Sequence, residues 1–156
     1  MDVETGELIA LVSYPEYDPN VLSRGTPSSV IASYATDPRE PYLDRAVSGL
    51  YTPGSIVKPM LAAGAYSDGI ISAEKIIVST GSISIPNPYD PSKPSIFKDW
   101  KAHGPVDMRR AIAVSSDVYF YAIGGGFGDQ KGMGIERLNY WYKAFGFADI
   151  TGIEIE

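Results

Sequence analysis

The sequence predicts an α+β domain in which part of an antiparallel sheet accompanies a mainly helical subdomain. Apolar residues make up 44% of the 156 residues, which is enough to form a core. Short apolar runs bounded by turn residues are typical of strands, and longer apolar or amphipathic stretches are typical of helices. We find no internal repeat and no domain boundary, so residues 1–156 are expected to belong to one domain.

The first expected element is a strand over residues 7–13, an apolar run that follows the turn Glu4-Thr5-Gly6. A strand needs a partner, and this partner should precede Met1, so we expect the domain to begin before this chain does. Turn signals dominate residues 15–41, where one short helix is expected at 28–34.

A buried helix is expected over residues 55–66, which are apolar almost all round. A turn at Pro53-Gly54 precedes it, and Ser67-Asp68-Gly69 ends it. Pro59 is tolerated only near a helix start, because proline lacks the N–H of the helical hydrogen bond. The helix should therefore begin near Ser55.

Two strands are expected in the middle of the chain, at residues 76–79 and 82–85, on either side of Thr80-Gly81. Four prolines then fill residues 86–94. Because proline cannot donate to a sheet or a helix, this stretch is expected to be a loop.

Helical signals dominate the rest of the chain. One helix is expected at 106–114, with Asp107 in its first turn, and another at 118–123, which a run of glycines from Gly124 ends. The last helix is amphipathic and is followed by Gly146 as its capping glycine; its apolar side chains are Ile135, Leu138, Tyr142 and Phe145. The closing residues 151–156 alternate like a strand.

Charge and composition exclude several classes of function. Thirteen Lys and Arg against 19 Asp and Glu give a net charge of −6, so the basic surface that a general nucleic-acid binder needs is missing. Neither a run of 18 apolar residues nor an apolar N-terminal stretch occurs, so the 156 residues show no membrane span and no signal peptide. The absence of cysteine excludes disulfides, thiolate metal sites and cysteine nucleophiles, and it leaves the redox compartment open.

No cofactor is expected. No metal-ligand spacing occurs, and the glycine run from Gly124 departs from G-x-G-x-x-G because Asp129 stands at the last glycine position. The single histidine, His103, is expected to be an ordinary loop residue, since no acid partner for a catalytic triad is recognisable.

A Ser-x-x-Lys pattern can place a serine hydroxyl beside an amine, because residues three apart share a helix face. Burial disfavours the charged form of a lysine, and a neutral amine can take the serine proton. Only Ser55/Lys58 follows a Pro-Gly turn and opens an apolar helix. The alternative interpretation of this match is that Ser55 caps the helix and Lys58 is solvated. The count alone decides nothing, because about 0.7 matches are expected by chance and three occur: Ser55/Lys58, Ser72/Lys75 and Ser95/Lys98.

A Ser-x-Asp pattern occurs once, at Ser115-Ser116-Asp117. It lies between two expected helices, where a loop could project polar groups into a cleft. The alternative is an N-cap for the helix that begins near Val118.

These patterns stand in four ordered segments that together resemble class B penicillin-binding proteins, most closely the penicillin-binding protein 2 type. Residues 45–59 resemble the active-site serine region of that family. Phe145-Gly146 and Thr151-Gly152-Ile153 agree as well, so the resemblance covers nearly the whole chain. The four segments are residues 1–20, 45–59, 97–104 and 111–121.

The resemblance implies a partial penicillin-binding-protein/β-lactamase-like transpeptidase fold and a peptidoglycan D,D-transpeptidase. In such enzymes a serine attacks the bond between two D-alanines, forms an acyl-enzyme and passes the acyl group to an amine of a neighbouring stem peptide. Carried over by motif, Ser55 is the nucleophile and Lys58 its general base. Ser115 relays the proton to the leaving amine, and Asp117 takes a position where many relatives have asparagine.

The resemblance also implies partners and a location. Peptidoglycan stem peptides are the expected substrates, β-lactam antibiotics the expected covalent inhibitors, and neither a cofactor nor a nucleic-acid partner is implied. The full-length protein is expected to be anchored at the outer face of the bacterial cytoplasmic membrane. There it would work with cell-wall synthesis partners and contribute to cell shape.

The chain departs from the family at one point. A third motif, Lys-[Thr/Ser]-Gly, edges the cleft in such enzymes, and no Thr-Gly or Ser-Gly in this sequence follows a lysine. We therefore expect part of a transpeptidase domain that lacks the first strand, this strand and the C-terminal part. Alone it should be weak or inactive, and an open sheet edge should favour self-association.

The rival readings are a related serine D,D-carboxypeptidase or β-lactamase-like hydrolase, and a non-catalytic fragment. The leading interpretation makes a geometric prediction. The Ser115 hydroxyl should lie within about 6 Å of the Ser55 and Lys58 side chains, the reach of a hydrogen bond or one bridging water.

Overall fold

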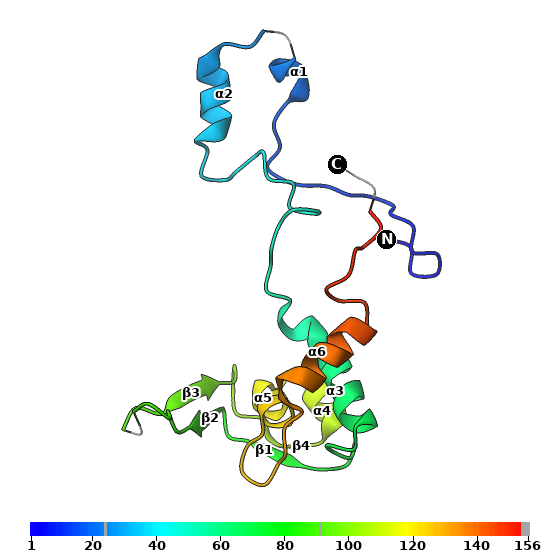
Figure 1. Ribbon diagram of the computed structural model, residues 1–156, viewed down its shortest axis with the longest axis vertical. Helices are drawn as coiled ribbons and strands as arrows, with labels where there is room; N and C mark the ends of the chain where they lie inside the picture. Colours follow the sequence, from blue (N-terminus) through cyan, green and yellow to red (C-terminus); the bar gives the residue numbers. More distant parts are fainter. Residues whose placement is uncertain (24, 91, 154–156) are drawn as a thin grey trace. The chain divides into compact units, whose positions relative to one another are not determined.

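A computed structural model describes residues 1–23, 25–90 and 92–153 (Figure 1). The described chain divides into two compact units. The first comprises the described residues of Met1–Thr52 and Thr151–Glu156, and the second is Pro53–Ile150. The second unit carries both serine motifs.

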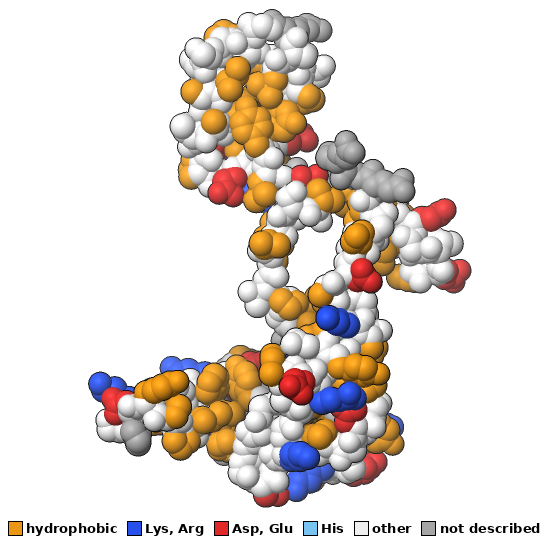
Figure 2. Space-filling model, viewed as in Figure 1, with side chains coloured by type: hydrophobic (Ala, Val, Ile, Leu, Met, Phe, Trp, Pro, Cys, Tyr) orange, Lys and Arg blue, Asp and Glu red, His pale blue; other side chains and the backbone are white. Residues whose placement is uncertain are grey.

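The first unit contains two helices, α1 (Pro19–Leu22) and α2 (Ser28–Ala35). The sequence predicts α2 within one residue, whereas the single turn of α1 was not expected. The Asp18 carboxylate caps α1 by accepting a hydrogen bond from the Asn20 N–H at 2.8 Å. Apolar side chains remain exposed on this part of the surface (Figure 2), among them Val21, Ile31 and Tyr42.

The prediction of a strand at residues 7–13 is wrong. The turn before it forms, with the Gly6 N–H donating to Asp2 O and the Asp2 N–H to Glu7 O. The apolar run itself pairs with no described segment, and Ile9 and Val12 are 77% and 79% exposed. A strand is stabilised by backbone hydrogen bonds to a partner strand, so this apolar run remains irregular where no described segment pairs with it.

The buried helix of the second unit begins later than expected. A 3₁₀ turn, η1 (Gly54–Val57), precedes the α-helix α3 (Lys58–Ser67). Pro59 has no N–H to give the Ser55 carbonyl, and the Lys58 N–H donates to that carbonyl instead, three residues on. Ser55 therefore lies in the 3₁₀ turn and Lys58 at the start of the α-helix.

Among the described residues, four short strands form two separate antiparallel pairs: β1 (Ile77–Ser79) with β4 (Gly104–Val106), and β2 (Ser82–Ile85) with β3 (Ser95–Lys98). The sequence places β1 and β2 correctly, but the two do not pair with each other. It also misses β3 and β4, because three- and four-residue strands beside prolines carry little pattern of their own.

Three further helices complete the second unit: α4 (Met108–Ala113), α5 (Asp117–Gly125) and α6 (Gly134–Ala144). The helix expected to begin at Val106 begins two residues later, because Val106 ends β4 and Asp107 caps α4 by accepting from the Arg110 N–H at 2.8 Å. Gly146, with φ +86°, follows α6 as expected.

The core of the second unit gathers where α3, α5 and α6 pack together. Gly64 of α3 lies so close to Trp141 of α6 that an added Cβ would come within 2.7 Å of the indole ring. The indole N–H donates to Asp68 at 3.0 Å, which fixes the ring against α3. The buried apolar side chains include Leu61, Ala65, Val106, Val118, Tyr119 and Ile123.

A strand was predicted at residues 151–156, and this prediction is wrong for residues 151–153, which form no strand. Residues 154–156 lie outside the described residues. In the described part of the chain, no helix combines the length and the apolar character that crossing a lipid bilayer requires.

Candidate active site

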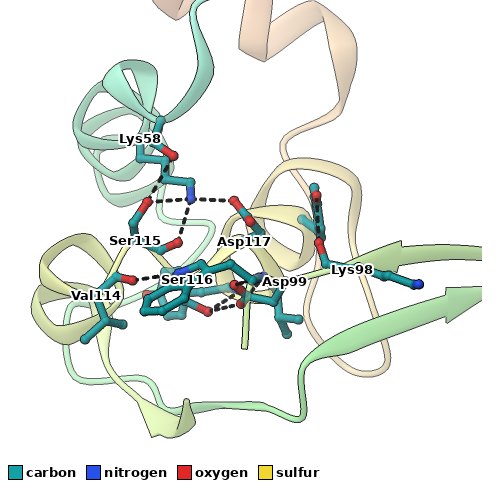
Figure 3. A network of polar contacts seen from close by, with 12 residues as sticks. Lys58, Lys98, Asp99, Val114, Ser115, Ser116 and Asp117 are labelled. Atoms are coloured by element: carbon teal, nitrogen blue, oxygen red, sulfur yellow. Dashed lines mark hydrogen bonds and ion pairs between the residues drawn. The ribbon is translucent and has the colours of Figure 1, made fainter. Parts of the chain in front are cut away.

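Two segments nearly sixty residues apart in the sequence bring the four predicted site residues together in the second unit. The turn η1 and the first residue of α3 supply two of them, and the loop between α4 and α5 with the first residue of α5 supplies the others. The four are Ser55, Lys58, Ser115 and Asp117, joined by hydrogen bonds and an ion pair (Figure 3).

Lys58 lies at the centre of this site. Its side chain is only 9% exposed, and its Nζ donates to Ser115 O at 2.8 Å, Ser115 Oγ at 2.9 Å and Asp117 Oδ1 at 2.5 Å. An ammonium group has three N–H donors, so these three acceptors use all of them. The alternative of a solvated lysine is thereby wrong.

The Ser115 hydroxyl joins the two halves of the site. Ser115 Oγ lies 3.0 Å from Ser55 Oγ, in a hydrogen bond, and accepts from Lys58 at the same time. Both distances are well within the predicted 6 Å, so that geometric prediction is confirmed. Ser55 itself is exposed, so its hydroxyl is open to a reactant.

Ser115 is held in an unusual backbone conformation. Its φ of +54° lies in the left-handed region, which residues with a Cβ seldom occupy. Lys58 contacts both the Ser115 carbonyl and its hydroxyl, so one buried side chain fixes this residue at two points. Such strain persists where surrounding contacts over-determine it, and it is frequent at functional sites.

The second serine of the Ser115-Ser116-Asp117 pattern acts as the helix cap. Ser116 is the N-cap of α5 and its hydroxyl accepts from the Tyr119 N–H at 3.4 Å, which frees Ser115 from the capping role considered for this motif. Asp117 is the first residue of α5, where a carboxylate is favoured by the helix dipole. The capping and functional interpretations of this motif therefore apply to different serines.

A buried carboxylate that was not assigned a role lies next to the motif. Asp99 is fully buried at its side chain, and its Oδ2 accepts from Ser116 Oγ at 2.9 Å and the Val118 N–H at 3.0 Å. Burial alone would raise the pKa of Asp99, but the hydrogen bonds from Val118, Ser116 and neighbouring N–H groups outweigh it and lower the pKa to about 2. Asp99 is therefore ionised at neutral pH.

His103 lies in a loop, as expected, but its side chain is buried beside a carboxylate that the sequence analysis did not recognise. Its side chain is 1% exposed, and its Nε2 lies 3.4 Å from Asp99 Oδ1. The ring also packs edge-on against Trp100, with centroids 4.9 Å apart. The sequence did carry a signal for this buried pair: Asp99 stands four residues before His103, with Trp100 between them.

The other two Ser-x-x-Lys pairs lack this geometry. Lys75 is 45% exposed and forms an ion pair with Asp129, whose side chain is 88% exposed. Ser95 and Lys98 are both exposed on β3. Of the three pairs, Ser55/Lys58, which the sequence context favours, is the one whose lysine is buried and hydrogen-bonded to a second serine.

Tyr121 of α5 is poorly suited to act as a base. Burial and the negative charges of Asp117 and Asp99 raise the pKa of Tyr121, because each disfavours the phenolate. Its hydroxyl donates to the Lys98 carbonyl at 3.3 Å. In residues 1–23, 25–90 and 92–153, no group of three or more His, Cys, Asp or Glu gathers as a metal site would require.

Comparison with known proteins identifies the family. The sequence signature described as the penicillin binding protein transpeptidase domain matches residues 1–156. The chain belongs to the penicillin-binding protein transpeptidase family. It is 38% identical to the peptidoglycan D,D-transpeptidase MrdA of Acinetobacter baumannii over 157 residues, an alignment that covers 99% of this chain and 22% of MrdA.

Solved structures show the same fold. PBP2 from Helicobacter pylori, in a complex with MreC, matches with a TM-score of 0.81 and 32% identity, over 97% of this chain and 27% of that protein. A ceftriaxone acyl-enzyme complex of penicillin-binding protein A from Mycobacterium tuberculosis matches with a TM-score of 0.73 and 25% identity, over 92% and 32% of the two chains. The mixed helices and small antiparallel sheets therefore form part of the transpeptidase fold, as the sequence predicts. The chain spans less than a quarter of the MrdA sequence.

Proposed function

We propose that this chain contributes the nucleophile and its proton-transfer partners to a peptidoglycan D,D-transpeptidase, as part of that enzyme's transpeptidase domain. The observation that carries the proposal is the Ser115 hydroxyl, which hydrogen-bonds to both Ser55 Oγ and Lys58 Nζ. A serine nucleophile needs a group that removes its proton, and this hydroxyl connects the exposed serine to a buried amine.

In the acylation step, Ser55 Oγ attacks the carbonyl carbon between two D-alanines of a stem peptide. Only a neutral amine can accept the Ser55 proton, so the Lys58 ammonium first releases one proton to solvent. The new Oγ–C bond then forms as the C–N bond breaks, and the Ser55 proton passes through the Ser115 hydroxyl to that amine. Hydroxyl hydrogens rotate freely, so the same three groups can return that proton through Ser115 to the leaving amine. The terminal D-alanine then departs and the acyl group remains on Ser55.

Asp117 supports the protonated form of Lys58 in this cycle. Its carboxylate lies 2.5 Å from Lys58 Nζ and faces the positive charge that forms when the lysine takes a proton. A carboxylate also keeps the amine directed toward Ser115 between turnovers. In the second step, an amine of a neighbouring stem peptide attacks the acyl-enzyme, and the cross-link forms as Ser55 regains its proton.

The relatives support the proposed substrates, inhibitors and partner, and the proposed location rests on the family resemblance. A relative named as a peptidoglycan D,D-transpeptidase and another trapped as an acyl-enzyme support stem peptides as substrates and β-lactams as covalent inhibitors. The PBP2–MreC complex supports a cell-wall synthesis partner, and we place the full-length protein at the outer face of the cytoplasmic membrane. Transfer to an amine distinguishes this enzyme from a carboxypeptidase or a β-lactamase, which transfer the acyl group to water.

The proposal is tested by labelling the full-length protein with a fluorescent penicillin. Wild type should be labelled, Ser55→Ala should not, and Ser115→Ala should react about 10²–10⁴-fold more slowly, the usual effect of losing a positioned proton-transfer group. The control is Ser72→Ala, which removes the serine of an exposed Ser-x-x-Lys pair and should react normally. Labelling of folded Ser55→Ala would contradict the proposal.

A second assay separates transpeptidation from its rivals. The protein is incubated with a stem pentapeptide, with and without an acceptor amine, and the products are analysed by mass spectrometry. A cross-linked product that requires the acceptor supports a transpeptidase. Release of D-alanine with only hydrolysed peptide, even with acceptor present, would indicate a carboxypeptidase.

A further inference from the structure

A buried polar cluster, centred on the Asp99 carboxylate, lies against the loop that carries Ser115. It consists of Asp99, Ser79, Ser116 and His103, and we refer to it as the Asp99 cluster. Ser79 and Ser116 are 1% and 0% exposed, and the side chains of Asp99 and His103 are 0% and 1% exposed. Four polar groups so completely removed from water need a reason, because buried polar groups lower stability unless they are well paired.

The Asp99 carboxylate connects two elements through one of its oxygens, Oδ2. Oδ2 accepts from Ser79 Oγ on β1 at 3.2 Å, and from Ser116 Oγ and the Val118 N–H at the start of α5. Oδ1 accepts from the Trp100 N–H at 2.8 Å. The strand β1 and the α5 N-terminus are thus tied to one carboxylate, which lies beside Ser116 in Figure 3.

Hydrogen bonds fix both the residue before Ser115 and the residue after it. Asp99 holds Ser116, the residue after it, and the neighbouring Trp100 holds Val114, the residue before it, through an indole N–H to carbonyl hydrogen bond of 3.2 Å. Ser115 between them has the left-handed φ of +54°. Two fixed neighbours and this backbone conformation together set the direction of the Ser115 side chain.

We propose that Asp99 is a positioning residue for acylation, which holds the Ser115 loop so that Ser115 Oγ stays in contact with both Ser55 and Lys58. This inference rests on the function proposed above and adds a residue that touches neither substrate nor nucleophile. Its effect is transmitted through Ser116 and the α5 N-terminus. The charge of Asp99 matters because a carboxylate can accept all of these hydrogen bonds at once.

The lowered pKa of Asp99 agrees with this role. A carboxyl that is ionised at neutral pH offers acceptors on both oxygens, whereas an asparagine would direct an NH₂ group at donors on one side. Asp99→Asn therefore keeps the volume of the side chain and removes part of its bonding. The variant tests positioning without opening a cavity.

The experiment compares acylation kinetics of the full-length protein with a fluorescent penicillin over a range of concentrations. Saturation separates the first-order acylation rate constant from the non-covalent binding constant, and the final labelled fraction gives the amount of active protein. Asp99→Asn should lower the acylation rate constant about 100-fold, the size of effect that misplacing a reacting group produces. Its binding constant should change less than about threefold, because Asp99 does not touch the ligand.

Matched variants make the test specific. Asp129→Asn, an exposed carboxylate in the same unit, should react like wild type. Ser116→Ala removes one of the two contacts between Asp99 and the loop, and should lower the rate constant about 10-fold, the usual worth of a hydrogen bond to a charged group. The two variants share the contact between Asp99 and Ser116, so the effects of Asp99→Asn and Ser116→Ala should be less than additive in the double variant. Any further slowing of the double variant measures the N-cap that Ser116 also provides to α5.

The outcomes separate this inference from the proposed function. If wild type is not acylated at Ser55, the proposed function fails and the inference fails with it. If wild type is acylated and the active fraction of Asp99→Asn reacts at the wild-type rate, the inference alone is overturned. If Asp99→Asn does not fold, Ser116→Ala decides: a slower acylation rate constant supports the positioning role, and an unchanged one overturns it.

Discussion

The ion pair between Lys58 and Asp117 should contribute measurably to stability, and the amount can be estimated from its burial. Exposed ion pairs contribute about 0.2–1 kcal/mol, whereas breaking a buried pair costs about 3–5 kcal/mol. The Lys58 side chain is 9% exposed and the Asp117 side chain 30%, so this pair lies between the two cases. We expect Asp117→Asn to lower the free energy of unfolding by about 2 kcal/mol, because a buried ammonium loses its counter-charge.

A double-mutant cycle isolates the pair from other effects of the substitutions. Wild type, Lys58→Met, Asp117→Asn and the double variant are unfolded in urea and followed by circular dichroism. The double variant should be more stable than the sum of the single losses predicts, with a coupling energy of about 1–2 kcal/mol.

The control cycle uses Lys75→Met and Asp129→Asn, a pair in the same unit that is 45% and 88% exposed. Its coupling energy should not exceed about 0.5 kcal/mol. If the coupling between Lys58 and Asp117 is no larger than that of this exposed pair, the ion pair does not hold the site together and the reasoning from burial is refuted.

Three further predictions concern stability. Gly64→Ala should lower the free energy of unfolding by about 1–2 kcal/mol, because the clash with Trp141 exceeds the gain in helix propensity. Gly124→Ala is the control: nothing lies within 4 Å of its added Cβ, so it should raise the free energy of unfolding by up to about 1 kcal/mol. A stabilising Gly64→Ala would contradict the close approach of α3 and α6. The pKa of Asp99 is lowered in the folded state, so its stabilising contribution is complete above about pH 4 and is lost as pH falls toward 2. The stability gap between wild type and Asp99→Asn should therefore narrow by about 2 kcal/mol over that range, and a constant gap in urea titrations would be inconsistent with an ionised Asp99. Ser115→Gly should be about 1 kcal/mol more stable than Ser115→Ala, because glycine adopts φ +54° without strain, and equal urea midpoints would argue against the left-handed conformation.

Local sequence signals located most of the helices but not the pairing of the strands. Periodicity and capping residues place α2, α5 and α6 within a few residues of their observed bounds. The strand pairs depend on long-range partners, as in β1 with β4, which no local pattern reveals. The same limit explains the error at residues 7–13, where a strand-like pattern finds no partner in the described chain.

The sequence predicts which residues form the candidate site, but not which additional residues hold them in place. Ser55 and Lys58 stand out because a Pro-Gly turn precedes them and an apolar helix follows. Ser55 and Lys58 contact Ser115 across 60 and 57 residues of chain, and Asp99 contacts Ser116 across 17, so both sets of contacts depend on tertiary packing. A single short pattern cannot encode that packing, which is why the role of Asp99 emerges only from the structure.

The central claim is that Ser55 is the residue that becomes acylated. The most direct measurement is peptide mapping by tandem mass spectrometry after the full-length protein has reacted with benzylpenicillin. The account predicts one covalent adduct, located on Ser55 and absent from Ser55→Ala. An adduct on Ser115 or on another serine, or no adduct on a protein shown to be folded, would contradict it.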